Sequence, residues 1–88
     1  MIKHTFKIGN RLGLHARPAA RLVRITGRFK SKVKINKDGM IADGKSIMGL
    51  MSLAAEVGSH LEFEIEGEDE QGAFEAIREL FENNFYEE

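Results

Sequence analysis

The chain has 88 residues with a formal net charge of −1 at pH 7, and it contains no cysteine. A chain of this length forms one small domain with a modest core, so we expect residues 1–88 to be a single domain. The lack of cysteine excludes a disulfide framework, a thiolate metal site and a thiolate nucleophile.

The N-terminal residues 2–8 have the alternation of a half-buried strand, with Ile2, Phe6 and Ile8 on the apolar side. This start does not form the apolar block of a signal peptide, and no apolar run in the chain approaches the length of a membrane span. We therefore expect a cytoplasmic protein without membrane insertion. His4 also falls on the apolar side of the strand, where a core or rim position is favoured over a functional one.

The stretch GLHARPAA at residues 13–20 combines features that indicate chemistry at its histidine. Gly13 permits a positive φ, and Pro18 suits the first turn of a helix that begins at Ala16. His15 would then lie at the helix N-cap, where the backbone N–H groups of Ala16 and Arg17 and the positive end of the helix dipole face the imidazole. Such a position holds an anion and favours the neutral, nucleophilic form of a nearby ring.

Two hypotheses therefore stand for His15. It either caps the helix and nothing more, or it attacks phosphorus as a nucleophile while Arg17 and the free N–H groups hold the phosphoryl oxygens. The residues alone leave both open.

The helix predicted from Ala16 to about Gly27 has an apolar face and a basic face. Its apolar positions are Ala16, Ala19, Ala20, Leu22, Val23 and Thr26. Its basic positions are Arg17, Arg21, Arg24 and Arg28. The arginine stripe is either a solvated face or a docking surface for acidic partner proteins. We weigh the two equally except at Arg17, where function is favoured.

A hairpin and a short helix follow in the pattern. Residues 32–36 and 40–42 read as two strands joined by the turn Lys37-Asp38-Gly39. Ser46 stands at the N-cap of a short helix that runs to Leu53. The helix has too many apolar residues for one face, so we expect some of them to be exposed: Ile47, Met48, Leu50, Met51 and Leu53.

The last two elements are a strand and a helix. Residues 61–66 alternate between apolar and glutamate side chains, and Asp69 caps a helix whose apolar stripe is Ala73, Phe74, Ile77, Leu80 and Phe81. The predicted order is β-α-β-β-α-β-α, an α+β fold. The end of the chain carries no pattern, and Phe85 and Tyr86 either cover the core or form an added contact.

The charge is divided unevenly along the chain. Residues 1–45 carry twelve Lys or Arg against two acidic residues, while residues 46–88 carry Arg78 against twelve acidic residues. Placing the acidic fourth strand between the basic first and second strands pairs these charges, which predicts an antiparallel sheet of order 1-4-2-3 with the helices on one face. Because the acidic half neutralises the basic half, we expect no nucleic-acid binding.

No other chemistry emerges from the pattern. The three histidines lack the spacing of metal ligands, and the glycines form no phosphate-binding loop, so we expect neither a metal nor a cofactor.

The stretch at 13–20 resembles the active-site signature of the HPr family, the histidine-containing phosphocarriers of the bacterial phosphotransferase system. Residues 45–53, KSIMGLMSL, are similar to the regulatory-serine segment of that family, at the matching distance from His15. Residues 66–70, EGEDE, resemble its lead-in to the last helix. The resemblance covers essentially the whole chain and implies an open-faced β-sandwich with the same sheet order, 1-4-2-3.

The resemblance also implies roles for individual residues. His15 would accept a phosphoryl group on Nδ1 from the phosphoenolpyruvate-dependent phosphotransferase, enzyme I, and pass it to sugar-specific IIA proteins. Arg17 and the backbone N–H of Ala16 would stabilise the phosphoryl group, and Ser46 would be phosphorylated by an HPr kinase/phosphorylase. Partners would dock on Ala20, Arg21, Arg24, Ile47, Met48 and Met51. The chain would be a monomeric, stoichiometric carrier and not an enzyme.

Two alternatives remain within the resemblance. One is a regulator whose phosphorylated Ser46 governs binding to a catabolite-control transcription factor. The other is a nitrogen-branch paralogue that is phosphorylated on the same histidine. A nucleic-acid-binding domain is a third class, and it rests on the arginine stripe alone.

Overall fold

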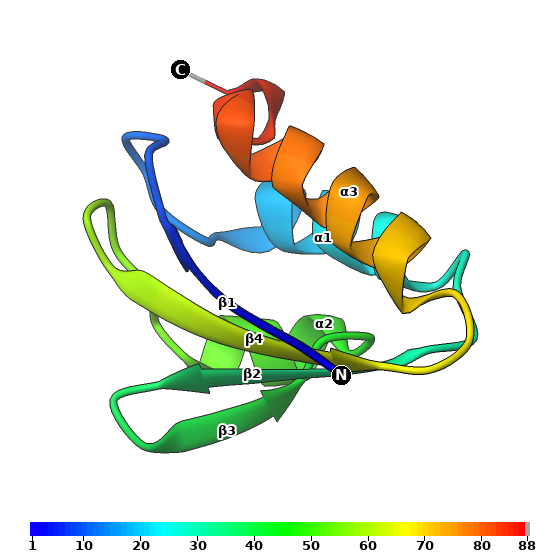
Figure 1. Cartoon of the computed structure of the whole chain (residues 1–88). Helices are drawn as coiled ribbons and strands as arrows, with labels where there is room; N and C mark the ends of the chain where they lie inside the picture. Colours follow the sequence, from blue (N-terminus) through cyan, green and yellow to red (C-terminus); the bar gives the residue numbers. More distant parts are fainter. Residues whose placement is uncertain (88) are drawn as a thin grey trace.

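The computed structural model describes residues 1–87 of the chain. Four strands and three helices follow one another, with a short 3-10 turn after the last helix (Figure 1). In chain order they are β1 (Ile2–Lys7), α1 (Ala16–Thr26), β2 (Lys32–Lys37), β3 (Met40–Asp43), α2 (Ile47–Ser52), β4 (His60–Glu66), α3 (Glu70–Glu82) and η1 (Asn84–Tyr86). The seven predicted elements are confirmed, and the turn η1 was not predicted.

The four strands form one antiparallel sheet in the order β1-β4-β2-β3, as the charge pattern predicted. Glu64 of β4 lies opposite Lys3 of β1 on one side and Lys34 of β2 on the other. Its carboxylate is 3.8 Å from the Lys3 ammonium and 3.5 Å from that of Lys34. Opposite charges on neighbouring strands therefore agree with the observed register.

The helices cover one face of the sheet, and the other face is open (Figure 1). Side chains of successive strand residues point to opposite faces, so each strand gives its apolar residues to the covered side. The inward residues of the sheet are buried: Phe6, Val33, Ile35, Ala42, Leu61, Phe63 and Ile65. The helices add Ala19, Leu22, Leu50, Ala73, Ile77, Leu80 and Phe81 to the same cluster.

His4 lies at the rim of this core. Its side chain is exposed, yet its ring is 4.5 Å from the ring of Phe6 and 5.2 Å from that of Phe74. One predicted core position is wrong, because Ala16 is exposed. It lies at the first position of α1, beyond the edge of the helix's buried stripe.

The loop before α1 is held rigidly where the helix begins. Gly13 has a φ of 72°, the left-handed conformation that glycine adopts without strain. The buried Asn10 side chain donates to the Gly13 carbonyl at 2.7 Å, and the Leu14 N–H donates to the Ala55 carbonyl at 2.8 Å. These bonds fix the direction in which the chain enters α1.

A further helix boundary agrees with the sequence. Ser46 caps α2, and the helix exposes part of its apolar set, as expected. No helix within residues 1–87 has the length and apolar character needed to span a membrane.

Candidate functional site

His15 lies at the N-cap of α1 in an extended conformation, with φ −83° and ψ −170°. Its backbone carbonyl accepts the first helical hydrogen bond, from the N–H of Ala19 at 3.0 Å. Its imidazole forms no capping hydrogen bond. The helix therefore begins through backbone hydrogen bonds, and the imidazole does not act as its cap.

The first turn of α1 is suited to an anion. The N–H groups of Ala16 and Arg17 have no carbonyl one turn earlier in the helix, and Pro18 has no N–H to satisfy. The turn holds no acidic residue. A negative group beside His15 would therefore meet free donors and the positive end of the helix dipole.

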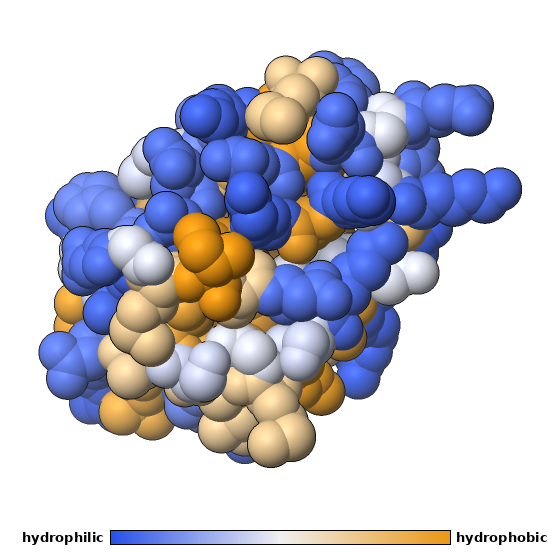
Figure 2. All heavy atoms as spheres, turned by 90° about the horizontal axis from the view of Figure 1, so that it is seen from below, coloured by the Kyte–Doolittle hydropathy of each residue, from blue (hydrophilic) through white to orange (hydrophobic). Residues whose placement is uncertain are grey.

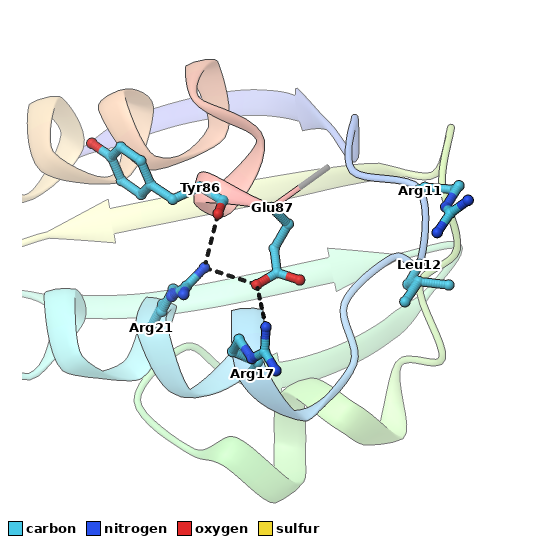
Figure 3. A pocket seen from close by; sticks show the side chains of 6 residues that line it. All are labelled: Arg11, Leu12, Arg17, Arg21, Tyr86 and Glu87. Atoms are coloured by element: carbon cyan, nitrogen blue, oxygen red, sulfur yellow. Dashed lines mark hydrogen bonds and ion pairs between the residues drawn. The ribbon is translucent and has the colours of Figure 1, made fainter.

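Two arginines and one glutamate gather at the outer side of this turn (Figure 3). Arg17 and Arg21 extend from α1, and Glu87 reaches them from the C-terminal segment. The Glu87 Oε2 atom is 2.8 Å from Nη1 of Arg21 and 3.6 Å from Nη1 of Arg17. Together with Arg11, Leu12 and Tyr86 they line a cavity of about 420 Å³.

Glu87 also faces the histidine. Its Oε1 atom is 3.5 Å from Nε2 of His15, and the glutamate side chain is only 12% exposed. The Nε2 atom is buried and has no hydrogen-bond partner among the described residues. Sequence reasoning did not find Glu87, because nothing in the local pattern of residues 82–88 indicates that it returns to α1.

Ser46 lies at the start of α2, a helix that packs against α1. Its Oγ atom accepts a hydrogen bond from the N–H of Gly49 at 3.0 Å, which is the predicted capping contact. The serine is half-buried, so its hydroxyl serves the helix terminus while one side of the residue reaches solvent.

The expected docking residues divide into three groups. On α2, Ile47 and Met51 are exposed and Met48 is 83% exposed. Their apolar neighbours Leu50 and Leu53, which were not expected to dock partners, are buried. On α1, Arg24 is exposed and Ala20 is half-buried. Arg21 differs from both groups, since its guanidinium donates to the Tyr86 carbonyl and to Glu87.

Exposed apolar atoms also gather on one side of the molecule. Figure 2 shows a patch of them on the face seen from below, surrounded by hydrophilic side chains. In Figure 1, α2 and the hairpin of β2 and β3 lie in that lower part. Within residues 1–87, no group of three or more histidine or carboxylate side chains is arranged to hold a metal ion.

Comparison with known proteins identifies the family. The family model described as PTS HPr component phosphorylation site matches residues 2–83. The chain belongs to the HPr family. HPr proteins are phosphocarriers of the phosphotransferase system and not catalysts, and they work together with the enzymes of that system.

Relatives and solved structures agree with this assignment. The phosphocarrier protein HPr of Treponema pallidum is 48% identical over 88 residues, with both chains fully covered. The phosphocarrier protein NPr of Proteus mirabilis is 43% identical over 82 residues, which cover 92% of this chain and 91% of that protein. The crystal structure of HPr-C-His from Thermoanaerobacter tengcongensis matches with a TM-score of 0.95 at 42% identity, covering 100% of this chain and 99% of that one.

Proposed function

We propose that this HPr accepts a phosphoryl group on His15 from an enzyme I-type donor and passes it to sugar-specific IIA proteins. The observation that carries the proposal is the free imidazole of His15 at the N-cap of α1. A histidine that served only the helix would bond to it. This one makes no capping bond and instead stands beside the first N–H groups of α1, with the Glu87 carboxylate as its acidic neighbour at 3.5 Å.

The chemistry needs little rearrangement of the chain. The lone pair of Nδ1 attacks the phosphorus in line, and the bond to the donor's leaving atom breaks with its electron pair going to the donor. The N–H groups of Ala16 and Arg17 and the Arg17 guanidinium then share the charge of the phosphoryl oxygens. The Arg17 side chain is 69% exposed, so it can turn toward the phosphoryl group without unpacking anything.

Partner proteins would dock on the surface formed by α1 and α2. This surface combines the exposed Arg24 with the apolar Ile47, Met48 and Met51, and it includes the half-buried Ala20 of α1, the helix that His15 precedes. Flexible methionine side chains suit a surface that meets both a donor and several acceptors. Acidic groups on the partners would complement the arginine.

The first test follows the phosphoryl group to an acceptor. Wild type, His15→Ala and His60→Ala are each mixed with phosphoenolpyruvate, an enzyme I-type donor and a IIA protein, and phosphorylation of the IIA protein is measured. His15→Ala should abolish transfer while the variant remains folded by circular dichroism. His60 is an exposed histidine of β4 and serves as the control, so its loss should leave transfer intact. Transfer by folded His15→Ala would refute the proposal.

We also propose that an HPr kinase/phosphorylase modifies Ser46. A phosphate at the N-terminus of α2 would be compatible with folding, because helix N-termini accept negative charge. Its two charges would stand next to Ile47 and Met48, on the docking surface. Ser46→Asp should therefore slow charging of His15 by the donor about tenfold, whereas Ser52→Asp at the other end of α2 should not. Equal rates for the two variants would argue against a shared docking surface.

A second candidate is favoured by one comparison. The Proteus mirabilis relative is named phosphocarrier protein NPr, which keeps open a regulatory paralogue of the nitrogen-branch or transcription-factor type. The same acceptor assay separates the two. Transfer to sugar-specific IIA proteins supports the carrier of sugar uptake, and charging of His15 without transfer to any of them supports the regulatory role.

A further inference from the structure

The C-terminal segment after α3 turns back onto α1. Asn84, Phe85 and Tyr86 all have a positive φ, between 50° and 58°, a conformation that side-chain-bearing residues rarely adopt in succession. Phe85 is fully buried, with its ring 4.7 Å from the ring of Phe81. This anchor and the left-handed turn direct Glu87 toward the start of α1.

Arg21 fixes the end of this segment in place. The two N–H groups of its Nη1 atom are shared among the carbonyls of Phe85 and Tyr86 and the carboxylate of Glu87, which lies at 2.8 Å. Figure 3 shows the contacts to Tyr86 and Glu87. Three acceptors on one guanidinium hold both the backbone and the side chain of the segment. The Glu87 carboxylate therefore has a defined position that does not depend on Arg17.

The second oxygen of that carboxylate lies near His15 without being hydrogen-bonded to it. It lies 3.5 Å from Nε2, a buried nitrogen that has no hydrogen-bond partner among residues 1–87. A carboxylate beside one imidazole nitrogen favours the tautomer with the proton on that nitrogen. The other nitrogen, Nδ1, is then left with a free lone pair.

We propose that Glu87, held by Arg21, is a positioning residue that keeps the proton of His15 on Nε2 and so prepares Nδ1 to receive the phosphoryl group. The inference rests on the proposed function of His15. As the N–P bond forms and the donor's bond to phosphorus breaks, the Nε2 proton stays and the ring gains a positive charge. Glu87 faces that charge, and onward transfer of the phosphoryl group restores the neutral ring.

Arg21 and Arg17 have different roles in this arrangement. Arg21 holds Glu87 at the shorter distance, while Arg17 meets it at 3.6 Å and is mostly exposed. Arg17 can therefore move from Glu87 to the phosphoryl oxygens while Arg21 remains paired with the Glu87 carboxylate. The opposite role, in which Glu87 competes with the phosphoryl group for Arg17, predicts effects of the opposite sign.

The test compares Glu87→Gln with wild type by two measurements on the full chain. Nitrogen-15 spectra of the neutral His15 ring report the tautomer before any phosphorylation, and a rapid-mixing assay with enzyme I and phosphoenolpyruvate reports the charging rate. We expect Glu87→Gln to shift the ring away from the Nε2–H form and to slow charging about 3- to 10-fold. Glu87→Asp, which keeps the charge, should recover part of both. Glu82→Gln on the exposed face of α3 is the control and should change neither.

A double-mutant cycle with Arg21→Gln tests the proposed chain of contacts. Each single change should give the same defect, and the double variant should be no worse than either, since both act through one carboxylate. An unchanged tautomer ratio in Glu87→Gln, or faster charging, would overturn the positioning role. If the wild-type chain takes no phosphoryl group from an active donor, the proposed function fails, and the ring spectra still decide whether Glu87 sets the tautomer.

Discussion

Gly13 is the residue on which the entry into α1 depends. At its φ of 72° a Cβ atom would lie 2.5 Å from the carbonyl oxygen of Ala55, which is backbone and cannot move aside cheaply. Gly39 in the hairpin has a similar φ of 90° and nothing within 4 Å of the same position. The two glycines thus separate the cost of backbone strain from the cost of a clash.

We predict that Gly39→Ala lowers the free energy of unfolding by about 1 kcal/mol, from the left-handed conformation alone. Gly13→Ala should cost about 1–3 kcal/mol more, because overpacking is added. Denaturant unfolding of both variants checks the difference. Equal losses would mean that the loop at Ala55 yields freely and does not fix the site.

Ser46 performs its capping role before any modification. Ser46→Ala removes the acceptor for the Gly49 N–H and should lower the free energy of unfolding by about 1 kcal/mol. Ser46→Asp keeps an acceptor at the N-cap and should be near wild type in stability. Ser52→Ala, which loses a hydroxyl contact to the Gly49 carbonyl at the exposed end of α2, is the control. A marked loss of stability in Ser46→Asp would mean that unfolding, and not the added charge, accounts for slower phosphoryl transfer by this variant.

At the scale of elements, charge pairing across β1, β4 and β2 was predictable from the alternation of lysine and glutamate. The pairs are partly exposed, so each contributes little. Glu64 is the acidic residue whose carboxylate meets a lysine on both neighbouring strands.

We therefore predict that Glu64→Gln lowers the free energy of unfolding by about 0.5–1 kcal/mol at low salt, and that the loss shrinks in 1 M salt. Glu62, which lies opposite Thr5 and Asn36, provides the control. Glu62→Gln should change stability less and show little salt dependence. A salt-independent loss in Glu64→Gln would indicate packing and not charge.

The turn η1 was not predicted from the sequence, in contrast to the strands and helices. The longer strands and helices were predicted from apolar periods of two and about 3.6 residues. The short elements β3 and α2 were predicted from the hairpin turn at residues 37–39 and from the N-cap residue Ser46. Residues 84–86 have no period, and no glycine indicates their left-handed backbone. Their conformation is set by tertiary contacts, namely the burial of Phe85 and the bonds from Arg21. Of the two interpretations of Phe85, covering the core is the one the structure supports.

At the scale of the whole molecule, long-range contacts close the structure at both ends of α1. Just after the C-terminal end of α1, the backbone N–H groups of Lys30 and Ser31 donate to the Asp69 carboxylate at 2.8 Å and 2.9 Å. The Ser31 hydroxyl donates to the same carboxylate. The Ser31 hydroxyl first, and then the Lys30 N–H, lower the pKa of Asp69 from its ordinary value of 3.8. The aspartate thus ties the loop after α1 to the start of α3.

This lowered pKa gives the stability of the protein a pH dependence. The unfolded chain binds a proton at Asp69 at a higher pH than the folded chain does, so the contact stabilises the fold fully above pH 3.8. Its contribution is lost as the pH falls through the folded pKa. Asp69→Asn should therefore be less stable than wild type at pH 7, and the difference should narrow below pH 3.8. Asp38→Asn in the hairpin turn is the control, and a constant difference across pH would contradict the account.

In the candidate site, too, residues with a local sequence pattern were predicted and residues placed by long-range contacts were not. His15, the free N–H groups and Ser46 were predicted because their signals are local: a glycine, a proline and a capping residue at fixed spacing. Glu87 was missed because it is separated by 66 residues from Arg21, its nearest charged partner. Arg21, expected on the docking surface, is bound within the chain for the same reason. Contacts between the two ends of the sequence depend on the complete fold.

The measurement that tests the central claim most directly is the location of the phosphoryl group on the charged protein. The chain is incubated with phosphoenolpyruvate and an enzyme I-type donor that is active on another HPr, and a proton–phosphorus correlation spectrum is recorded with the intact mass. The account predicts one acid-labile phosphoryl group, coupled to the ring of His15. A phosphoryl group on His4 or His60, or none at all, would contradict it.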